Sequence, residues 1–564
     1  MSLFSVFNMS DRFAEVIKRF PVVMIFAVLT TISLLFIDTY EDNFLRWSLI
    51  GYIGFLVMLD WAIFKEVYQL SSHKYWIGVG ILSILLFVYY YFIPASFQEE
   101  ISCFWYFTIG LNVVLHFMCA VIPFFKNYTQ KGFVNYNIQV FLSWIKSAFY
   151  ALVTYLALCL ALVAMDQLFD INIPSIHYLR LFIVMTGIFQ VAFFLSDFPD
   201  EYYHLKFTAS PIFRVFTSYI AIPVTLIYGL ILLAYIVRIF LGYEMVEWVF
   251  VLCIWYFVIG ILTWLFSLYF ENQDDNPWMV WFRKWFFILS VPILLLLLIA
   301  LFRHISDKGI LEEFYISASI ASFVLLIILL KCLPVKSDLR AFPLFLILIT
   351  IITFWSGPIS ICNLPITNQK HRLINMMSEA GMIKDGNLVS DSIRIKADDE
   401  PDFSRMVYFL SSRGALDFVK TMDKNHLLND NDLANSLMQR VSGSQGMESE
   451  KILSFYKSKH PALDINDYQQ MLHIHQTGEV GLSDSYGLRD RNILVIRVDK
   501  KLVYEGDIAK ILWDQSQKDA ENLDFELEND DYLFKVVVNS ASGSFSNSSA
   551  RLDDFTGFIL VKKK

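Results

Sequence analysis

The chain changes its chemistry abruptly near residue 363. Up to that point apolar runs of about 18–26 residues follow one another with short polar gaps, and beyond it no such run occurs. Charged residues make up about 12% of residues 1–363 but about 28% of residues 364–564. A stretch so poor in charge cannot cover a globule with a water-soluble surface, so lipid must be its solvent. We therefore expect a membrane domain over residues 1–363 and a soluble domain over residues 364–564.

Composition excludes several classes of protein. Of the 564 residues, 56% are hydrophobic and the mean hydropathy is +0.51, which lies outside the range of soluble globular proteins. The formal net charge of −9 is the opposite of the basic balance that nucleic-acid binders need. We therefore expect the lipid bilayer as a partner and no nucleic acid.

The cysteines give no sign of a disulfide framework or a metal site. They stand in or beside the apolar runs, with no CxxC spacing, at Cys103, Cys119, Cys159, Cys253, Cys332 and Cys362. A free cysteine in an apolar segment behaves as a small hydrophobic side chain. We interpret all six in this way, and we expect no metal and no cofactor.

The apolar runs predict an all-α polytopic helix bundle of eleven membrane spans. At about 1.5 Å per residue, each run is long enough to cross a hydrocarbon core of roughly 30 Å. Trp47, Tyr75, Trp248 and Trp285 stand at the start of four runs, as amphipathic rings do at headgroup level. The predicted spans are 20–37, 47–64, 75–93, 104–125, 140–165, 178–195, 215–236, 248–270, 285–302, 314–333 and 341–361.

The lysines and arginines of the predicted loops indicate an orientation. With the N-terminus inside, thirteen of them fall in cytoplasmic segments and four fall in the opposite loops, namely Arg46, Arg238, Arg303 and Lys308. Cytoplasmic loops carry the excess of positive charge, so we expect the N-terminus in the cytoplasm of a bacterial cell. An odd number of spans then puts the C-terminal domain on the far side of the inner membrane. One span more or fewer would return it to the cytoplasm.

The C-terminal region has the pattern of a small α+β domain. Apolar residues at helical spacing predict helices at 368–382, 403–410, 415–422 and 432–441. After Leu472 the period changes to two, which predicts strands at 492–498, 501–505, 523–527, 532–538 and 555–561. The serine-rich stretch 540–549 is typical of a loop. Helices followed by strands indicate an α+β fold.

Three groups of residues carry a resemblance to a known family. They are Ile222-Pro223 with Tyr235-Ile236, Arg303-His304-Ile305 with Glu312, and Gly357-Pro358 with Asn368-Gln369 and Asp385-Gly386. These groups resemble a family of bacterial multi-pass membrane proteins that is classed only as a domain of unknown function. Lys308, Leu311 and Phe314 depart from the pattern of that family. The resemblance implies a polytopic membrane region followed by a soluble domain, and it implies no activity because the family has none assigned.

Polar side chains inside the predicted spans are the first candidates for a functional site. A charged group at a helix centre costs about 2.5–3.5 kcal/mol on insertion scales, so each one needs a reason to be there. Asn112 and His116 stand four apart on one face of the fourth span, where they could bond to each other, join helices or line a polar path. Asp60 stands late in the second span, about one turn from Lys65. We expect Asp60 to reach water or to pair with that lysine.

A second candidate cluster stands in a predicted cytoplasmic turn. Asp197, Asp200, Glu201 and His204 bring together three carboxylates and an imidazole. Glu201 and His204 have the spacing found in di-metal helical bundles, but such a site needs a second copy and two more glutamates. The sequence has no second copy, so a solvated turn is the favoured interpretation.

No sequence motif names a reaction. The chain lacks GxxxxGK[ST], HExxH and GxSxG, and it lacks a run of gating arginines or a TVGYG-like filter. A sizeable folded tail without a catalytic constellation favours a non-catalytic, envelope-associated binding or sensing protein. A secondary transporter is the first alternative, because Asn112, His116 and Pro223 are polar or helix-breaking groups within spans. Against it, no matching broken segments are visible in two halves. An intramembrane enzyme that depends on Asp60 or His116 is the second alternative.

Overall fold

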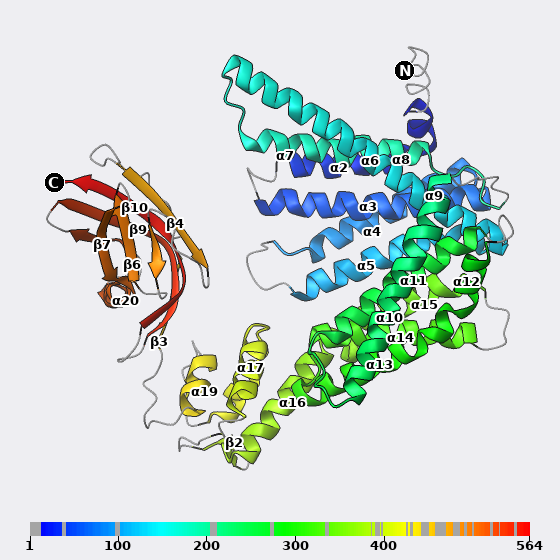
Figure 1. Ribbon diagram of the computed structural model, residues 1–564. Helices are drawn as coiled ribbons and strands as arrows, with labels where there is room; N and C mark the ends of the chain where they lie inside the picture. The colour runs from blue at the N-terminus through cyan, green and yellow to red at the C-terminus, as the bar shows by residue number, and fades with distance from the viewer. Residues whose placement is uncertain are drawn as a thin grey trace. The chain divides into compact units, whose positions relative to one another are not determined.

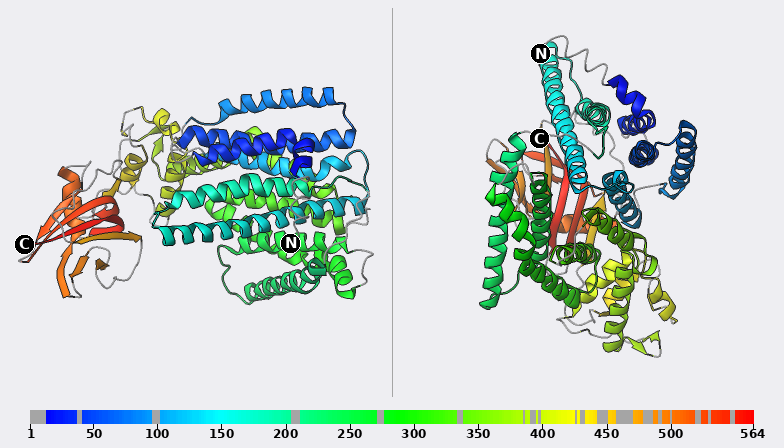
Figure 2. Two further views of the ribbon diagram at one scale, coloured as in Figure 1. Left: turned by 90° about the horizontal axis from the view of Figure 1, so that it is seen from above. Right: turned by 90° about the vertical axis from the view of Figure 1, so that its right-hand side faces the viewer.

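The computed structural model (Figures 1 and 2) describes residues 13–36, 41–95, 102–203, 211–270, 276–332, 338–384, 386–389, 395, 399–424, 427–428, 433–441, 451–456, 470–477, 486–489, 493–498, 501–518, 523–528, 531–545 and 550–564. The chain forms two compact units. The first comprises residues 1–391 with 395–438, and the second comprises residues 392–394 with 439–564. The first unit therefore extends beyond residue 363, where the change in composition occurs.

The first unit is built mainly of helices. It begins with Phe13–Arg19, α2 (Pro21–Leu35), α3 (Glu41–Tyr68), α4 (Ser72–Phe92), α5 (Ser102–Val121), η1 (Ile122–Phe124) and α6 (Gln130–Phe169). Next come α7 (Ser175–Val184), η2 (Met185–Gln190), α8 (Val191–Ser196), α9 (Pro211–Val215), η3 (Phe216–Ala221), α10 (Ile222–Phe240) and α11 (Val249–Tyr269). The last apolar helices are α12 (Pro277–Leu289), α13 (Val291–Lys308), α14 (Glu312–Cys332) and α15 (Ala341–Trp355), followed by η4 (Gly357–Ile359).

The described helices confirm the polytopic all-α architecture and correct the number of spans. Nine of them are long and apolar enough to cross a membrane, and they carry the second to the tenth predicted spans. The first predicted span, 20–37, coincides with Pro21–Leu35, which meets the preceding helix Phe13–Arg19 at a bend of 106° and makes a tenth crossing if the two helices form one span. The eleventh coincides with α15, which is apolar but only 15 residues long. Pro21 begins a new helix at its first position, and Pro358 cannot continue the helix that ends before it.

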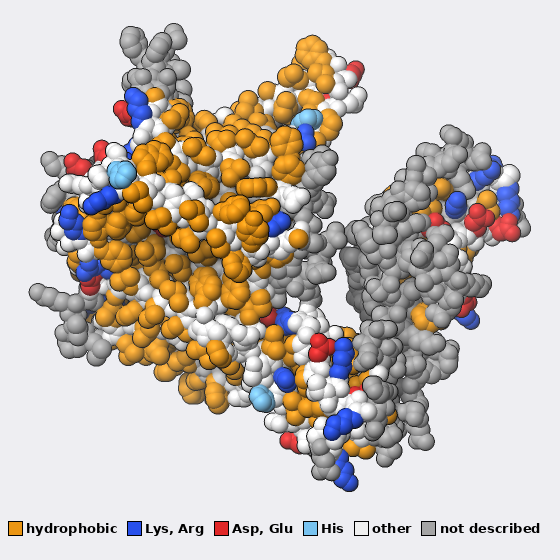
Figure 3. Space-filling view, turned by 180° about the vertical axis from the view of Figure 1, so that it is seen from behind, with side chains coloured by type: hydrophobic (Ala, Val, Ile, Leu, Met, Phe, Trp, Pro, Cys, Tyr) orange, Lys and Arg blue, Asp and Glu red, His pale blue; other side chains and the backbone are white. Residues whose placement is uncertain are grey.

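Close approach of two backbones joins α2 to α3. A methyl group at Gly51 would lie 2.8 Å from the backbone nitrogen of Thr30, and one at Gly54 would lie 2.2 Å from the ring of Phe26. Membrane helices pack by van der Waals contact, and small residues let them approach closely enough to make it. Large apolar side chains cover the outside of the first unit, and Figure 3 shows the broad hydrophobic surface that they form on one face.

Two consecutive spans contain π-helical turns. η2 separates α7 from α8, and η3 separates α9 from α10, with Pro223 directly after it. A π turn inserts a residue into the helical hydrogen-bond ladder, and such turns occur frequently at functional sites. η2 packs against α2, where a methyl group at Gly187 would lie 2.1 Å from Thr31 Oγ1. Pro223 is visible in the sequence, whereas no residue type marks the π turn in the sixth span.

Four helices follow the apolar region, as the sequence predicted. They are α16 (Leu364–Glu379), α17 (Glu400–Ser411), α18 (Phe418–Met422) and α19 (Leu433–Val441), with a hairpin of β1 (Ile383–Lys384) and β2 (Asn387–Leu388) after α16. α17 packs against α16. Its buried face consists of Phe403, Met406, Val407 and Leu410, which repeat at helical spacing.

The described residues of the second unit form two antiparallel sheets and one helix, which confirms the predicted α+β fold. The larger sheet has the order β3-β9-β10-β4, with β8 paired to β9, and the smaller sheet has the order β5-β6-β7. The elements are β3 (Lys451–Tyr456), β4 (Gln470–Thr477), β5 (Tyr486–Arg489), β6 (Ile493–Val498), β7 (Lys501–Asp507), α20 (Ile508–Lys518), β8 (Phe525–Glu528), β9 (Tyr532–Phe545) and β10 (Ala550–Lys563). All five predicted strands are present, and β3, β4, β5 and α20 were not predicted.

The core of the second unit lies between strand β9 and helix α20. Phe534, Val536 and Val538 alternate along β9 and share one face, as the period of a strand requires. They join Ile508 and Leu512 of α20 in one buried cluster. The alternation that predicted the strand is therefore the alternation that fills the core.

The predicted loop at 540–549 is wrong over residues 540–545. These residues continue β9 and pair with both β3 and β10. Serine does not favour strands by itself, but the backbone hydrogen bonds of this segment to two neighbouring strands outweigh that low propensity. Pairing with a distant strand leaves no trace in a local sequence pattern.

Candidate functional site

Asp60 is a carboxyl group buried among the membrane helices. It stands on α3, eight residues or about 12 Å before that helix ends at Tyr68. Its side chain is 8% exposed, and neither of its carboxyl oxygens has a hydrogen-bond partner in the described part of the chain. Withdrawing a charge from water without donors costs several kcal/mol. An intramembrane carboxyl group held at such a cost is a candidate functional residue.

The expected pairing of Asp60 with Lys65 does not occur. Lys65 Nζ lies 4.6 Å from the ring centroid of Tyr75 on α4, which is a cation–π contact. Five positions along an α-helix turn the side chain by about 140°, so the two residues point to different sides of α3. The expectation that Asp60 reaches water is also wrong, because neighbouring helices cover it.

Asp60 is accompanied by a thiol and a phenol from two other helices. The thiol of Cys119, near the end of α5, and the phenol of Tyr136, near the beginning of α6, lie within electrostatic reach of Asp60. Tyr136 is fully buried, and its hydroxyl donates a 3.1 Å hydrogen bond to the backbone carbonyl of Cys119. Helices α3, α5 and α6 therefore contribute to a small polar region inside an apolar core.

Asn112 and His116 lie together, but they meet through the backbone of α5. His116 Nδ1 is 2.9 Å from the carbonyl oxygen of Asn112. The Asn112 side chain instead donates a 2.7 Å hydrogen bond to the hydroxyl of Tyr52 on α3. Asp60 follows Tyr52 by two helical turns on the same helix, so it is not part of this group. Asn112 is half-buried and ties α5 to α3, whereas His116 is exposed and bonds to the backbone of its own helix.

A network of Arg19, Glu66 and Tyr202 lies at the end of the bundle nearest Asp60, and we call it the Arg19 network. Arg19 donates two parallel 2.8 Å hydrogen bonds to the Glu66 carboxylate, from Nε to Oε1 and from Nη2 to Oε2. It also donates to the carbonyl oxygens of Phe198 and Pro199, at 3.1 and 2.7 Å. Tyr202 donates a 2.5 Å hydrogen bond to Glu66 Oε2. A bidentate arginine–carboxylate pair of this kind is strong and directional.

Buried phenols connect the Arg19 network with the region of Asp60. The ring centroids of Tyr136 and Tyr202 are 5.6 Å apart. Burial raises the pKa of Tyr202 above its usual range, and the nearby charge of Glu66 raises it further. The side chains of Arg19 and Glu66 keep 26% and 25% of their surface exposed. Polar groups therefore extend from a partly exposed ion pair to the fully covered carboxyl group of Asp60.

The sequence could have suggested this network only in part. Glu66 and Tyr202 stand 136 residues apart, and Arg19 stands 47 residues before Glu66. The one available signal was that Arg19 and Glu66 carry opposite charges at the ends of two neighbouring apolar runs. Which of the many helix-end charges pair is decided by packing, and packing is not visible in a single sequence.

The members of the predicted acidic cluster, Asp197, Asp200, Glu201 and His204, do not form one site. Asp197 Oδ2 accepts hydrogen bonds from Ser143 Oγ and Lys146 Nζ, each at 2.7 Å, which tether the loop to α6. Asp200 and Glu201 are exposed, and His204 lies outside the described residues. Within the ranges that the structure describes, no three histidine, cysteine or acidic side chains are grouped to hold a metal ion.

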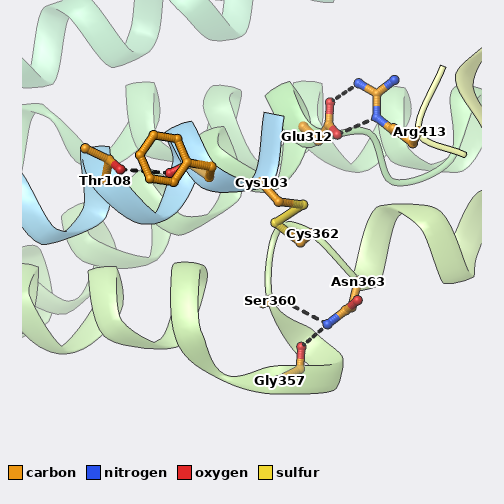
Figure 4. Close-up of a disulfide and its surroundings, with 9 residues drawn as sticks. Cys103, Thr108, Glu312, Gly357, Ser360, Cys362, Asn363 and Arg413 are labelled. Atoms are coloured by element: carbon orange, nitrogen blue, oxygen red, sulfur yellow. Dashed lines mark hydrogen bonds and ion pairs between the residues drawn. A yellow bond between two sulfur atoms is a disulfide. The ribbon is translucent and has the colours of Figure 1, made fainter. Parts of the chain in front are cut away.

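A disulfide joins two cysteines that we had interpreted as apolar side chains (Figure 4). Cys103, at the start of α5, is bonded to Cys362, which follows α15, across a sequence separation of 259. That interpretation was wrong because local spacing carries no information about partners so far apart. α5 and α15 also pack against each other, so the bond closes one end of a helix pair that contacts along its length. The other four cysteines are free.

Near the disulfide, side chains of α16 hold the turn between α13 and α14. Gly309 has a φ of +79°, and a methyl group on it would lie 2.6 Å from Gln369 Nε2. Asn368 Oδ1 accepts a 2.8 Å hydrogen bond from the backbone N–H of Ile310, and Gln369 Nε2 donates a 3.0 Å bond to the carbonyl of Lys308. Asn368 and Gln369, which belong to the family resemblance, therefore contact the turn that lies between two other parts of it, Arg303-His304-Ile305 and Glu312.

An ion pair links the helices after the apolar region to the start of α14. Arg413 donates to the carboxylate of Glu312 from Nε at 2.7 Å and from Nη2 at 2.5 Å (Figure 4). The two side chains are only 21% and 13% exposed. This pair and the Gly309 turn bind α16 and the segment after α17 to the membrane helices, which explains why the first unit extends past residue 363.

Comparisons with known proteins add no activity to this geometry. No family model matches the chain, and no solved structure matches it. The chain is 24% identical over 399 residues to the uncharacterized protein PM1469 of Pasteurella multocida (strain Pm70). The matched region covers 68% of this chain and 64% of that protein. The match thus spans less than two thirds of the relative's own length. The family resemblance stays a prediction, and the multi-pass architecture rests on the helices themselves.

Proposed function

We propose that this chain is a non-catalytic inner-membrane protein of the bacterial envelope whose second unit binds or senses a ligand outside the cytoplasm. The apolar helices anchor it in the membrane, with the N-terminus in the cytoplasm. The observation that carries the proposal is the disulfide between Cys103 and Cys362. The separate folded core of the second unit supports its role as the binding module, because a membrane anchor does not need such a core.

Redox chemistry and charge distribution support the same orientation. Disulfides persist in oxidising compartments, such as the bacterial periplasm, and are rare in the cytosol. When the bent first span and the short helix α15 both cross the membrane, the distribution of lysine and arginine assigns the helix ends that carry Cys103 and Cys362 to its far side. After Cys362, no described helix is long and apolar enough to return the chain across the bilayer. The second unit would then lie in the periplasm.

The sheet of the second unit offers a place for a ligand. Among the described strands of the larger sheet, β3 pairs with β9 alone and β4 pairs with β10 alone, so both are edge strands, and β4 also packs against β5. The free side of an edge strand presents backbone groups that can pair with an extended segment of a partner. The sequence has none of the catalytic motifs considered above, which favours binding over chemistry.

Photocrosslinking in intact cells tests this proposal. A photoreactive phenylalanine derivative is placed at Lys510 on α20 or at Lys563 near the end of β10, both of which are exposed. We expect ultraviolet light to produce a discrete adduct with an envelope component from at least one of these positions. The matched control carries the same derivative at Trp278, which is exposed at the start of α12 in the first unit. The same adduct from all positions, or none from either position in the second unit, contradicts the proposal.

A secondary transporter is the second candidate, and the buried carboxyl group of Asp60 favours it. Ionisable groups within spans mark ion and proton pathways in transporters. The π turns η2 and η3 interrupt two consecutive spans, and helices interrupted near the bilayer midplane are typical of transport sites. These interruptions were not visible in the sequence, where the lack of matching broken segments counted against transport.

Solute uptake in variant strains tests the transport candidate. Asp60→Asn is expected to abolish the uptake or export of a solute while the amount of protein in the membrane stays unchanged. Asp197→Asn serves as the control, because Asp197 is bonded to Ser143 and Lys146 at the surface and has a structural role. A deletion strain without any solute phenotype removes the support for transport.

A further inference from the structure

We propose that Asp60 is a proton-binding site that exchanges its proton with water through the Arg19 network. The site comprises Asp60 itself, the phenols of Tyr136 and Tyr202, and Glu66, which lies at the partly exposed end. The inference rests on the geometry around Asp60, and it holds whether or not the protein moves a solute.

The surroundings of Asp60 favour its neutral form. The ionisable groups within electrostatic reach of Asp60 on α5 and α6 are the Cys119 thiol and the Tyr136 phenol, and neither is a cation. α2 and η1, which also pack against α3, carry no ionisable side chain. On α4, Tyr75 interacts with Glu66 and Lys65 instead. With no cation and no donor among the described residues to balance a charge, the carboxyl group keeps its proton.

A short distance separates this carboxyl group from water. Glu66 follows Asp60 by six positions, or about 9 Å, along α3, and its side chain points about 120° away around the helix, so the route must pass through side chains of other helices. The rings of Tyr136 and Tyr202 lie 5.6 Å apart, and a phenol hydroxyl can both donate and accept a hydrogen bond. Tyr202 already donates to Glu66, whose side chain is one quarter exposed. Proton uptake forms one O–H bond on Asp60 and removes one proton from the water at Glu66, with no change in any redox state.

The same surroundings favour a proton over a metal cation. Hard cations are held by several oxygen ligands at once. Around Asp60 the described polar groups are one thiol and one phenol, and the phenol of Tyr136 already donates to the backbone carbonyl of Cys119. A proton needs only the carboxyl group itself.

Labelling with dicyclohexylcarbodiimide tests the proton-binding site in the full-length protein in membrane vesicles. This apolar reagent reacts with protonated carboxyl groups: the acid proton moves to a nitrogen, the oxygen bonds to the central carbon, and rearrangement gives an N-acylurea without a leaving group. Water-exposed carboxyl groups, with pKa values of about 4, are ionised at about pH 8. We expect mass spectrometry at that pH to find the label on Asp60 and not on Glu66, which is paired with Arg19.

Two outcomes overturn the proposal. One is the absence of label from Asp60 at about pH 8 while the protein remains folded. The other is protection of Asp60 by sodium chloride, compared with choline chloride at equal pH and ionic strength, which would make the ligand a sodium ion. Peptide mapping of the unaltered chain needs no variant, and Asp60→Asn is expected to remove the label while Asp197→Asn retains it.

Infrared spectroscopy in heavy water tests the route to the Arg19 network. The carbonyl stretch of protonated Asp60 shifts when its proton is replaced by deuterium, and the rate of this shift reports access to water. We expect Tyr136→Phe to slow the exchange at least several-fold. Tyr256→Phe is the matched control, because Tyr256 is an equally buried phenol that bonds to Ser290, away from Asp60. Equal exchange rates in the two variants exclude Tyr136 from the route.

Discussion

Glu66 and Asp60 stand six residues apart on α3, yet their carboxyl groups meet opposite conditions. Glu66 accepts two hydrogen bonds from Arg19 and one from Tyr202, whereas Asp60 accepts none from the described residues. A satisfied half-buried carboxylate contributes to stability, while an unsatisfied buried one lowers it. Its contribution to stability therefore explains why a carboxyl group stands at Glu66, whereas stability gives no reason for a buried carboxyl group at Asp60. This contrast makes Asp60 the functional candidate.

The bidentate pair of the Arg19 network yields a prediction about stability. Arg19→Ala removes the Arg19 hydrogen bonds to Glu66, Phe198 and Pro199, and we expect the free energy of unfolding to fall by about 2 kcal/mol. Thermal unfolding of the protein in detergent measures this loss. Lys146→Ala is the control, since the side chains of Lys146 and Asp197 are 47% and 41% exposed and such pairs contribute less than about 1 kcal/mol. Equal losses in the two variants would contradict the prediction.

A second ion pair gives a prediction about pH. Burial raises the pKa of Asp338, but hydrogen bonds from Arg340 outweigh burial and hold it below the ordinary value of 3.8. A carboxyl group with a lowered pKa in the folded state stabilises that state above its ordinary pKa, and the contribution is lost as the pH falls through the lowered value. We expect Asp338→Asn to remove this part of the acid dependence of the melting temperature below about pH 4. If the melting temperatures of the variant and the unaltered protein fell equally with pH, Asp338 would make no such contribution to stability.

The contact between α2 and α3 shows how elements are joined in the membrane. Neither helix is amphipathic in a way that predicts its partner, and the contact depends on Gly51 and Gly54. Because the nearest atoms to a side chain at Gly51 belong to the backbone of Thr30, a larger residue there must push the two helices apart. The contact between α2 and α3 is therefore sensitive to a single methyl group at Gly51.

Gly51→Val is expected to destabilise the protein by about 1–3 kcal/mol, the usual cost of overpacking. The measurement is thermal unfolding in detergent, together with the yield of folded protein. Gly80→Ala on α4 is the matched control, since nothing lies within 4 Å of a methyl group at that position. Replacing that glycine within a helix is expected to change stability by no more than about 1 kcal/mol, in the stabilising direction. If Gly80→Ala lowered the free energy of unfolding as much as Gly51→Val, the close contact of α2 with α3 would not explain the effect of Gly51→Val.

At the level of elements, the sequence predicts what depends on local pattern and misses what depends on pairing. Hydropathy located all eleven apolar segments, because a membrane span must satisfy the hydrogen bonds of its own backbone and must be almost free of charged side chains. Alternation located five strands for a similarly local reason. The bend before Pro21, the serine-rich end of β9 and the partner of Cys103 each depend on residues far away in the chain. Asp60 could be named as a candidate, but its burial and the Arg19 network could not.

At the scale of the whole molecule, a covalent bond and a set of polar contacts close the end of the bundle from which the chain leaves the membrane. The Cys103–Cys362 bond, the turn at Gly309 and the Glu312–Arg413 pair all lie around the exit from α15. They fix the path of the chain before it reaches the second unit. The side of the membrane on which this end lies therefore decides the side on which the second unit works.

Thiol counting tests the disulfide on which the orientation depends. In denaturant without reductant, the unaltered protein is expected to react with maleimide at its four free cysteines. Cys103→Ser should add a reactive thiol, because Cys362 loses its partner, whereas Cys253→Ser should remove one. A loss of one thiol in both variants would mean that Cys103 and Cys362 are not bonded.

The orientation of the membrane domain is tested most directly by labelling intact spheroplasts with a membrane-impermeant maleimide. Lys563→Cys puts a thiol at the exposed end of β10, and Cys332, exposed at the end of α14, is the internal control. We expect the thiol at position 563 to react before the membrane is permeabilised, and Cys332 to react only afterwards. Labelling of Cys332 alone in intact spheroplasts, or of position 563 only after permeabilisation, would contradict the proposed orientation.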